Sequence, residues 1–125
     1  GWLFSDLRYD FVRTWFTRLS DAPFDQVEQI YKELEDEGRL AIKNTSVTPS
    51  EITVKRAADM RYVGQEHAVT VDLPMPLFAA QDREGIKRAF DEMHLLRYGT
   101  NAPKERAEIV SLRSTVTGVM RKPPQ

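Results

Sequence analysis

Apolar and polar residues alternate with a period of two near the start of the chain. One parity is apolar or aromatic and the other is mainly charged or hydroxylated: Leu7, Tyr9, Phe11, Trp15 and Leu19 against Asp6, Arg8, Asp10, Thr14 and Arg18. This alternation is typical of a β-strand with one buried face. Val12 and Phe16 place apolar side chains on the polar parity. We interpret them as a partly apolar second face that meets a partner.

A helical period follows this strand. Apolar residues recur three and four positions apart: Val27, Ile30, Tyr31, Leu34, Ala41 and Ile42. With Asp21 as its cap and Pro23 in its first turn, the pattern predicts one helix from about Phe24 to Lys43. Gly38 is expected to weaken or bend the last turns, since glycine costs about 1 kcal/mol relative to alanine in a helix.

Two further alternating segments lie on either side of Gly64. The first carries Ile52, Val54, Ala58, Met60 and Tyr62, and the second runs from His67 to Leu73 with Val69, Val71 and Leu73 facing inward. Gly64 can adopt the positive φ of a tight turn, so the two strands are predicted to pair as a hairpin. The prolines of "LPMPLF" cannot donate to a β-ladder, and this segment is predicted to be a connector.

A second helix and a last strand complete the pattern. Asp82 is a plausible cap, Gly99 stands where a left-handed stop belongs, and an apolar stripe lies between them: Ile86, Ala89, Phe90 and Met93. Beyond residue 106, apolar residues alternate with polar ones: Val110, Leu112 and Val116 against Ser111, Arg113 and Thr115. Residues 120–125 are predicted to form a polar tail.

The element order is therefore strand, helix, strand, strand, helix, strand. It predicts an α+β fold, a two-layer sandwich in which an antiparallel sheet of about four strands carries two helices on one face. The arrangement is ferredoxin-like, or a variant with another strand order. Residues 1–125 fit a single domain.

Composition narrows the function classes. The net charge of -1 gives no general attraction to nucleic acid, and the basic residues are interleaved with acids and predicted to be solvated: Lys55, Arg56, Lys87, Arg88, Arg121 and Lys122. The absence of cysteine excludes disulfides and thiolate zinc sites and favours a cytoplasmic location. No apolar run is long enough to cross a membrane. Since the chain does not begin with methionine, we expect it to be a piece of a longer polypeptide.

The stretch "DMRYVGQEH", residues 59–67, gathers the most polar chemistry. Asp59 and Arg61 share a parity and so a face, where they could present a carboxylate and a guanidinium to a ligand, or form ordinary surface ion pairs at a hairpin rim. Gln65 is not needed by the turn. The two histidines, His67 and His94, lack metal-binding spacing, and no nucleotide-binding or nucleophile motif is present.

Four segments, in order, resemble the hydantoinase A and 5-oxoprolinase family. "ADMRYVGQEHAVTVDLP" resembles its D-x-R-Y-x-G-Q segment and "AFDEMHLLRYG" its F-H-x-x-H-x-x-x-Y-G helix, while "AEIVSLRSTVTG" resembles the strand that follows. "GWLFSDLRYDFVRTW" resembles the segment by which the family's polypeptide enters its C-terminal domain. The chain departs from the family at Asp91, where histidine is frequent, at Ser111, where asparagine is frequent, and at Leu95 and Leu96, which replace a charged pair.

The matched motifs supply the candidate site. Asp59, Arg61, Gln65 and His94 are the candidate catalytic residues, although none is assigned a catalytic role. The remaining matched positions are expected to be structural: Tyr62, Gly64, Phe90, Arg97, Tyr98, Gly99, Leu112 and Arg113.

The resemblance implies the C-terminal domain of a larger ATP-dependent enzyme that opens cyclic amides of the hydantoin or 5-oxoproline class. The same domain occurs in acetone and acetophenone carboxylases. The implied partners are preceding ATPase-like domains of the same chain and a hydantoinase B-like subunit or domain, with ATP and a divalent metal bound elsewhere in the parent. By itself the fragment would be inactive and would serve structure or an interface. A free-standing ferredoxin-like module that binds a ligand or protein through Asp59 to Glu66 is the alternative from another class.

Overall fold

The computed structural model describes residues 5–121. Its elements are β1 (Leu7–Arg18), the 3-10 turn η1 (Leu19–Asp21), α1 (Phe24–Asn44), β2 (Glu51–Tyr62), β3 (Val69–Asp72), α2 (Met75–Ala79), α3 (Arg83–Tyr98) and β4 (Ala107–Val119). Within the described range no helix is long and apolar enough to cross a membrane. Most of the predicted polar tail, residues 122–125, lies outside the described residues.

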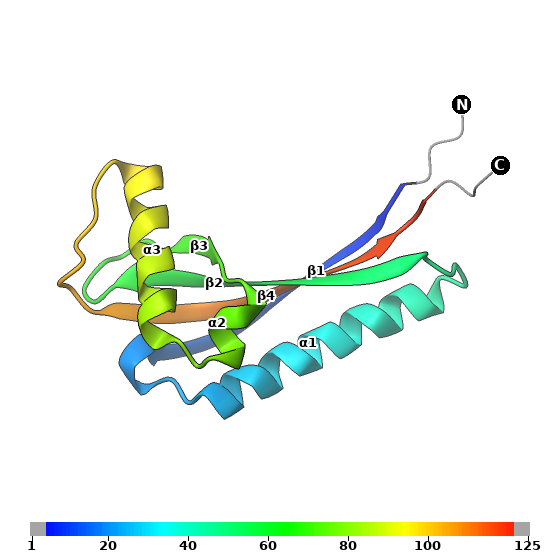
Figure 1. Cartoon of the computed structure of the whole chain (residues 1–125), viewed down its shortest axis with the longest axis horizontal. Coiled ribbons are helices and arrows are strands. Elements are labelled where there is room, and N and C mark those ends of the chain that lie inside the picture. The colour runs from blue at the N-terminus through cyan, green and yellow to red at the C-terminus, as the bar shows by residue number, and fades with distance from the viewer. Residues whose placement is uncertain (1–4, 122–125) are drawn as a thin grey trace.

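The strands form one antiparallel sheet in the order β1-β4-β2-β3. The predicted α+β sandwich is therefore confirmed, with helices packed against a four-stranded sheet (Figure 1). A ferredoxin-like order would insert β3 between β1 and β2, whereas here β4 lies between them and β3 takes the edge. The fold is thus the variant, and β1 and β3 are its two edge strands.

All three helices cover the same face of the sheet. α1 runs along its full length, and α2 and α3 lie beside the half that includes β3 (Figure 1). One core unites them with the inward parity of the strands: Val27, Ile30, Tyr31 and Leu34 of α1, Phe78 of α2, Ile86 and Phe90 of α3, and Ala58, Met60, Tyr62, Val69, Val71, Ile109 and Leu112 of the sheet. The opposite face of the sheet carries no helix, and we call it the open face.

A β-bulge in β4 changes which residues face the helices. Asp59 of β2 lies opposite Ser111, but the next residue, Met60, lies opposite Ile109, so β4 has one residue more than β2 at Val110. Ile109 joins the core and Val110 is only half-buried, which corrects the predicted inward position of Val110. The bulge also turns Glu108 towards the open face.

The long helix α1 begins and packs differently from the prediction. Pro23, not Asp21, is its N-cap, because Asp21 belongs to η1 and makes no cap hydrogen bond. Gly38 does not interrupt the helix, which continues to Asn44. A side-chain Cβ at Gly38 would stand within 2.5 Å of the Cβ of Val116, so the glycine is the place where α1 lies closest to β4.

The second half of the chain follows the predicted signals with two corrections. Asp82 accepts a hydrogen bond from the backbone N–H of Gly85 at 2.9 Å, and Gly99 ends α3 with a φ of 76°, as predicted. The expected connector "LPMPLF", residues 73–78, contains most of the short helix α2 (Met75–Ala79), because its two prolines occupy the cap and the first turn, where no N–H is needed. β3 begins at Val69 and leaves His67 in the turn.

Candidate functional site

The motif at residues 59–67 divides between the two faces of β2. Asp59 and Arg61 point to the open face, whereas Tyr62 points into the helix-covered core. Gly64 makes the turn with a φ of 88°, as predicted. The side chain of Gln65 then reaches the end of α3. The four candidate residues therefore do not form one cluster.

Asp59 is a buried carboxylate on the open face. Its oxygens accept hydrogen bonds from Arg113 Nε at 2.8 and 2.9 Å and from Thr70 Oγ1 at 2.6 Å. Asp59 is 9% exposed, so its charge is compensated by Arg113 across the neighbouring strand. Asp59 thus pairs with Arg113, which lies diagonally across on β4, and not with Arg61, because the residue directly opposite Asp59 is the uncharged Ser111.

Arg61 instead pairs with Glu108, which lies directly opposite it on β4. Its Nε donates to Glu108 Oε1 at 3.2 Å, and one terminal nitrogen donates to the carbonyl of Glu66 at 3.3 Å. The guanidinium also lies over the ring of Phe16, 5.3 Å from the ring centre. Glu108 reaches Arg61 only because the bulge at Val110 reverses the parity of β4.

The fold brings Gln65 and His94 together, and their hydrogen bonds form a continuous series from Tyr62 to Thr100. The backbone N–H of Tyr62 donates to Gln65 Oε1 at 3.1 Å, and Gln65 Nε2 lies 2.9 Å from His94 Nε2. His94 Nδ1 lies 2.6 Å from the carbonyl oxygen of Thr100, which can only accept. The proton of the neutral ring is therefore on Nδ1, and Nε2 accepts from the amide of Gln65. His94 is held as a structural link between the hairpin turn and the loop after α3.

Tyr62 ties the same region together from the core side. Its hydroxyl donates to Asp91 Oδ1 at 2.5 Å and accepts from the backbone N–H of Ala102 at 2.9 Å. Burial raises the pKa of Tyr62 to about 12, and the hydrogen bond to Asp91 adds to the effect. Lys87 Nζ compensates Asp91 at 2.8 Å. Asp91, a departure from the family pattern, is thus a central acceptor that the motif matching missed, although its spacing of four from Lys87 was a visible signal.

Arg56 was predicted to be solvated and is instead buried, with 3% of its surface exposed. Its Nε donates to Glu35 at 2.8 Å, and its two terminal nitrogens donate to Glu28 at 2.7 Å each. The guanidinium also lies over the rings of Tyr31 and Phe78. Its parity with Val54 and Ala58 was the overlooked signal, since all three point to the helices.

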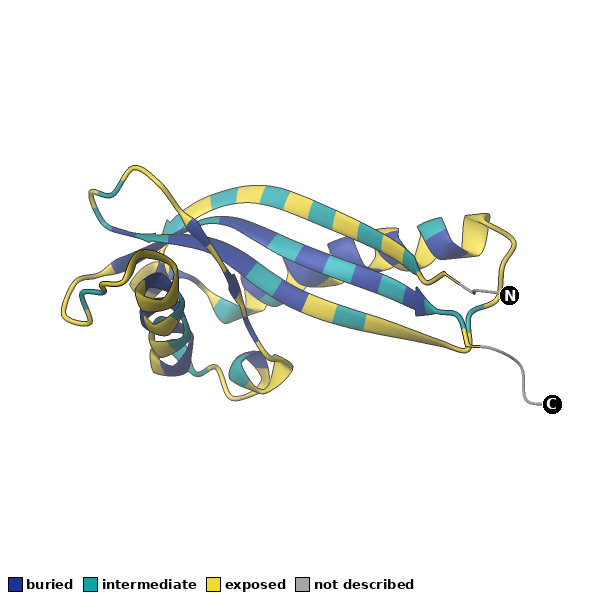
Figure 2. Ribbon diagram, turned by 90° about the horizontal axis from the view of Figure 1, so that it is seen from above, coloured by how far each residue is buried: buried dark blue, intermediate teal, exposed yellow. Residues whose placement is uncertain are grey.

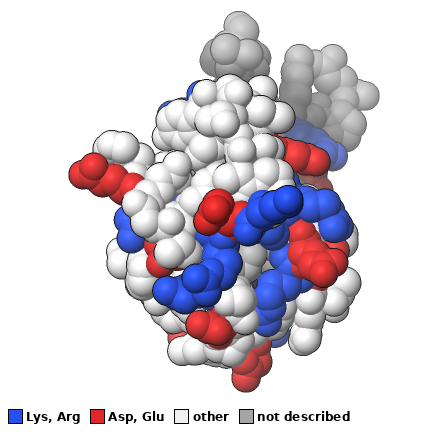
Figure 3. All heavy atoms as spheres, turned by 90° about the vertical axis from the view of Figure 1, so that its left-hand side faces the viewer, with Lys and Arg blue, Asp and Glu red and all other residues white. Residues whose placement is uncertain are grey.

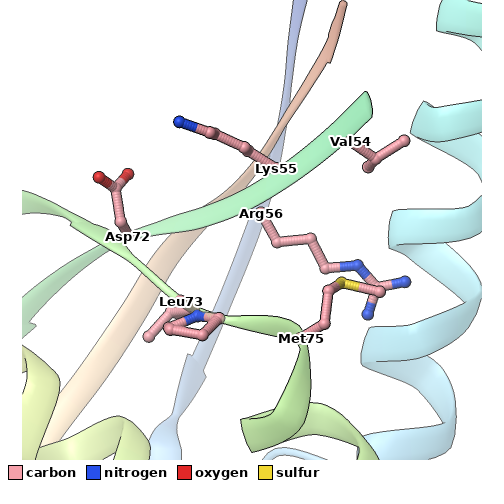
Figure 4. A pocket seen from close by; sticks show the side chains of 7 residues that line it. Val54, Lys55, Arg56, Asp72, Leu73 and Met75 are labelled. Carbon is pink, nitrogen blue, oxygen red and sulfur yellow. The ribbon is translucent and has the colours of Figure 1, made fainter. Parts of the chain in front are cut away.

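A pocket of about 230 Å³ adjoins this ion pair. Figure 4 shows Arg56 and Met75 pointing towards α1, while Lys55 and Asp72 point to the other side of the sheet. Hydrogen bonds to Arg56 lower the pKa of Glu28, and they raise the pKa of Arg56 although burial opposes this. Because each of its three nitrogens already donates to a carboxylate of α1, the pocket holds no guanidinium N atom without a partner.

The other matched residues have mixed environments. Phe90 is fully buried and packs against Tyr62 and His94, and Tyr98 lies against the outer side of His94 with 50% of its surface exposed. Arg97 and His67 are exposed. Gly99 supplies the left-handed end of α3. Within the α3 motif, Phe90, His94 and Tyr98 therefore pack against one another or against Tyr62, and Gly99 ends the helix.

The open face has a polar hollow of about 380 Å³ beside the Asp59–Arg113 pair. β2 contributes only Ala57, whereas the polar lining comes from β1, β3 and β4: Arg8, Asp10, Thr70, Asp72, Arg113, Ser114 and Thr115. At the end of the molecule seen in Figure 3, basic and acidic side chains are interleaved and form no single-sign patch. Among residues 5–121, no three histidine, aspartate or glutamate side chains gather as metal ligands. Asp59 and Arg61 of the motif are each paired with a charged residue of β4, Arg113 and Glu108 respectively.

Curated relatives match almost the whole chain. The alpha subunit of a caprolactamase from Pseudomonas jessenii is 24% identical over 127 residues, which cover 99% of this chain and 18% of that subunit. An uncharacterized protein of Methanocaldococcus jannaschii is 26% identical over 123 residues, which cover 98% of this chain and 17% of that protein. The chain thus spans less than a fifth of the length of these relatives.

Solved structures of two larger proteins contain the same fold as this chain. The ATP-dependent caprolactamase from Pseudomonas jessenii superposes with a TM-score of 0.78 at 25% identity, covering 97% of this chain and 18% of that one. Nucleotide-free acetone carboxylase shares the fold, with a TM-score of 0.57 at 17% identity, covering 95% of this chain and 18% of that one. The family model of the hydantoinase/oxoprolinase C-terminal domain matches residues 19–121. The chain therefore belongs to the hydantoinase/oxoprolinase C-terminal domain family.

Proposed function

We propose that this chain acts as the C-terminal domain of an ATP-dependent enzyme that opens a cyclic amide. In that enzyme it positions other parts and does not itself perform the chemistry. The observation that carries this proposal is that each candidate residue is already bonded inside the domain: Asp59 to Arg113, Arg61 to Glu108, and Gln65 to His94. These contacts fix each side chain against another part of the domain, which supports a positioning role.

The class of substrate is inferred from the relatives. The name caprolactamase denotes action on a lactam, which is a cyclic amide, and that enzyme's structure is more similar to this chain than the acetone carboxylase structure is, at TM-scores of 0.78 and 0.57. This difference favours a cyclic amide over a ketone. Hydantoin, 5-oxoproline and simple lactams all fit the proposal.

ATP and a divalent metal belong, in this proposal, to other parts of the parent enzyme. The sequence has no phosphate-binding glycine loop, and residues 5–121 bring no carboxylate and histidine ligands together. The partners that we propose follow from the family resemblance: preceding ATPase-like domains of the same polypeptide and a hydantoinase B-like subunit or domain. A cytoplasmic location remains the expectation from the lack of cysteine.

Nucleotide turnover by the purified 125-residue chain tests the proposal. We expect no saturable ATP hydrolysis with or without added Mg²⁺ and cyclic amide, because the chain holds none of the nucleotide-binding part. A coupled phosphate-release assay would measure it, with the parent enzyme as the positive control. Saturable hydrolysis by the isolated chain, lost on heat denaturation, would contradict the proposal.

A further inference from the structure

β1 is an edge strand of twelve residues, and its outer side is unpaired. Among residues 5–121 it is hydrogen-bonded to β4 alone, because the sheet order of the described strands ends at β1. A long edge of this kind is a template for pairing with another strand. β3, the other edge strand, has only four residues.

The side chains of β1 are incompletely covered on both faces. The residues that point towards the helices, including Tyr9, Phe11 and Trp15, are only half-buried, as the alternating yellow and teal along this strand shows (Figure 2). On the open face Val12 is 49% exposed and Phe16 is 57% exposed. Large apolar side chains left half-covered along a whole edge are typical of a surface that another protein covers.

The open-face residues of β1 read symmetrically about Thr14. In order they are Asp10, Val12, Thr14, Phe16 and Arg18. The register of β1 with β4 shifts between Thr14 and Thr17, but exposure still alternates along β1 through these residues. If a second copy of β1 pairs antiparallel with the first and the two-fold axis passes at Thr14, Val12 lies opposite Phe16 of the other copy. Asp10 then lies opposite Arg18, and this ion pair occurs twice. Directly opposite side chains on one face are about 5 Å apart, so each of these pairs is in contact.

Neighbouring registers are less complementary. Opposite residues of an antiparallel pair share a face, so the axis must pass at a residue. Centred on Arg13, the pairing sets Arg8 against Arg18 and Arg13 against itself. Centred on Val12, it sets Asp6 against Arg18, leaves Asp10 opposite Thr14 and places Phe16 opposite Arg8. Of these three centres, only Thr14 places Val12 opposite Phe16 and also sets Asp10, which contacts Arg8 and Thr115 within its own chain, opposite Arg18.

We propose that β1 pairs with β1 of a second copy of this chain about a two-fold axis at Thr14, which joins the two sheets into one. The occupant of the edge is thus the chain itself. This inference does not depend on the proposed function, since it concerns only β1. If the chain proves monomeric, the proposed function still stands, and ATP hydrolysis by the isolated chain would not contradict the β1 pairing.

Cysteine cross-linking tests both the pairing and its register. The chain has no native cysteine, so a single Thr14→Cys variant carries the only thiol. Opposite Cα atoms lie about 4.5–5.5 Å apart, within disulfide range. We expect T14C to form a covalent dimer under mild oxidation, while Thr53→Cys, an equally exposed threonine on β2, stays monomeric. Predominant cross-linking of V12C would overturn the register.

A second experiment reverses the charges of Asp10 and Arg18 and measures the dimer dissociation constant by sedimentation equilibrium. Asp10→Arg and Arg18→Asp each set like charges opposite one another twice, and each is expected to raise the dimer dissociation constant about tenfold or more. The double variant D10R/R18D restores opposite charges and should return the constant to within about threefold of the original. Circular dichroism would verify that each variant is folded. A native chain that is monomeric at every accessible concentration, or T14C that cross-links no faster than T53C, refutes the pairing.

Discussion

A single hydroxyl, that of Tyr62, joins three separate parts of the chain. It lies on β2, donates to Asp91 of α3 and accepts from Ala102 in the loop that leads to β4. The adjacent Gln65 and His94 link the same hairpin to Thr100. These aromatic and amide side chains of the two motifs thus link β2, α3 and the loop before β4 at one corner of the domain.

Replacing Tyr62 by phenylalanine tests the strength of this corner. The change removes one hydrogen bond to a buried carboxylate and one from a backbone N–H, so we expect the free energy of unfolding to fall by about 1–3 kcal/mol. Urea unfolding followed by circular dichroism measures it. Tyr98→Phe is the matched control, because Tyr98 is half-exposed, and it should change stability little. A neutral Y62F would mean that the hydroxyl contributes nothing.

The same variant predicts a pH dependence. The pKa of Tyr62 is raised to about 12 in the folded state, above the ordinary value of about 10. Below pH about 10 the ring is protonated in both states and this contribution is complete; above that, the unfolded state loses its proton first, so stability falls as pH rises towards 12. Y62F should lose less stability over this range than the native chain. A residual loss is expected from Tyr31, whose pKa burial also raises.

The pairing of α1 with the sheet depends on one glycine and one buried arginine. Gly38 lets α1 lie against Val116 of β4, and Arg56 of β2 holds Glu28 and Glu35 of α1. These contacts span residues 28–38, and Glu35 lies about one turn before Gly38. They keep a helix of 21 residues aligned with the strands beneath it.

Gly38→Ala tests the closeness of that contact. In an exposed helix the change would stabilise by about 1 kcal/mol, but the new methyl group would overlap Val116. We therefore expect a net loss of about 1–3 kcal/mol in the free energy of unfolding, because α1 must move away from β4. Glu37→Ala, the exposed neighbour in the same helix, should be close to neutral. Stabilisation by G38A in thermal or urea unfolding would show that the helix can shift freely.

At the scale of the whole molecule, the two faces of the sheet differ in what they contain. The helix-covered face buries the core, and the open face displays Asp59, Arg113, Arg61 and Glu108 in cross-strand pairs. In the proposed parent enzyme, we expect this open face to contact the other domains.

Substitutions in the full-length parent test this division. We expect Arg61→Ala to reduce assembly with the other domains or subunit as much as it reduces ATP-dependent turnover, and Gln65→Ala to do so to a smaller extent. Gel filtration with light scattering measures assembly beside the turnover assay. Arg97→Ala, an exposed arginine on α3, serves as the control. Normal assembly with turnover abolished in R61A would instead assign Arg61 to the reaction.

Local signals predicted most elements because they depend on neighbours in the chain. The Asp82 cap, the Gly64 turn and the left-handed Gly99 each need only a few residues to form. Period-two alternation likewise placed Met60, Tyr62, Val69 and Val71 in the core. The short helix α2 was missed because its prolines were read as strand breakers alone.

The sequence by itself determined the fold class, the single helix-covered face, the family and the residues of its motifs, since periodicity, caps and motif spacing are properties of contiguous residues. Only the tertiary structure decided the strand order, the bulge at Val110 and the partners of each charge. Those features depend on which strands lie side by side, and pairing across strands brings together residues about 50 positions apart, such as Asp59 with Arg113. The charged pairs are therefore set by register, which no local pattern encodes.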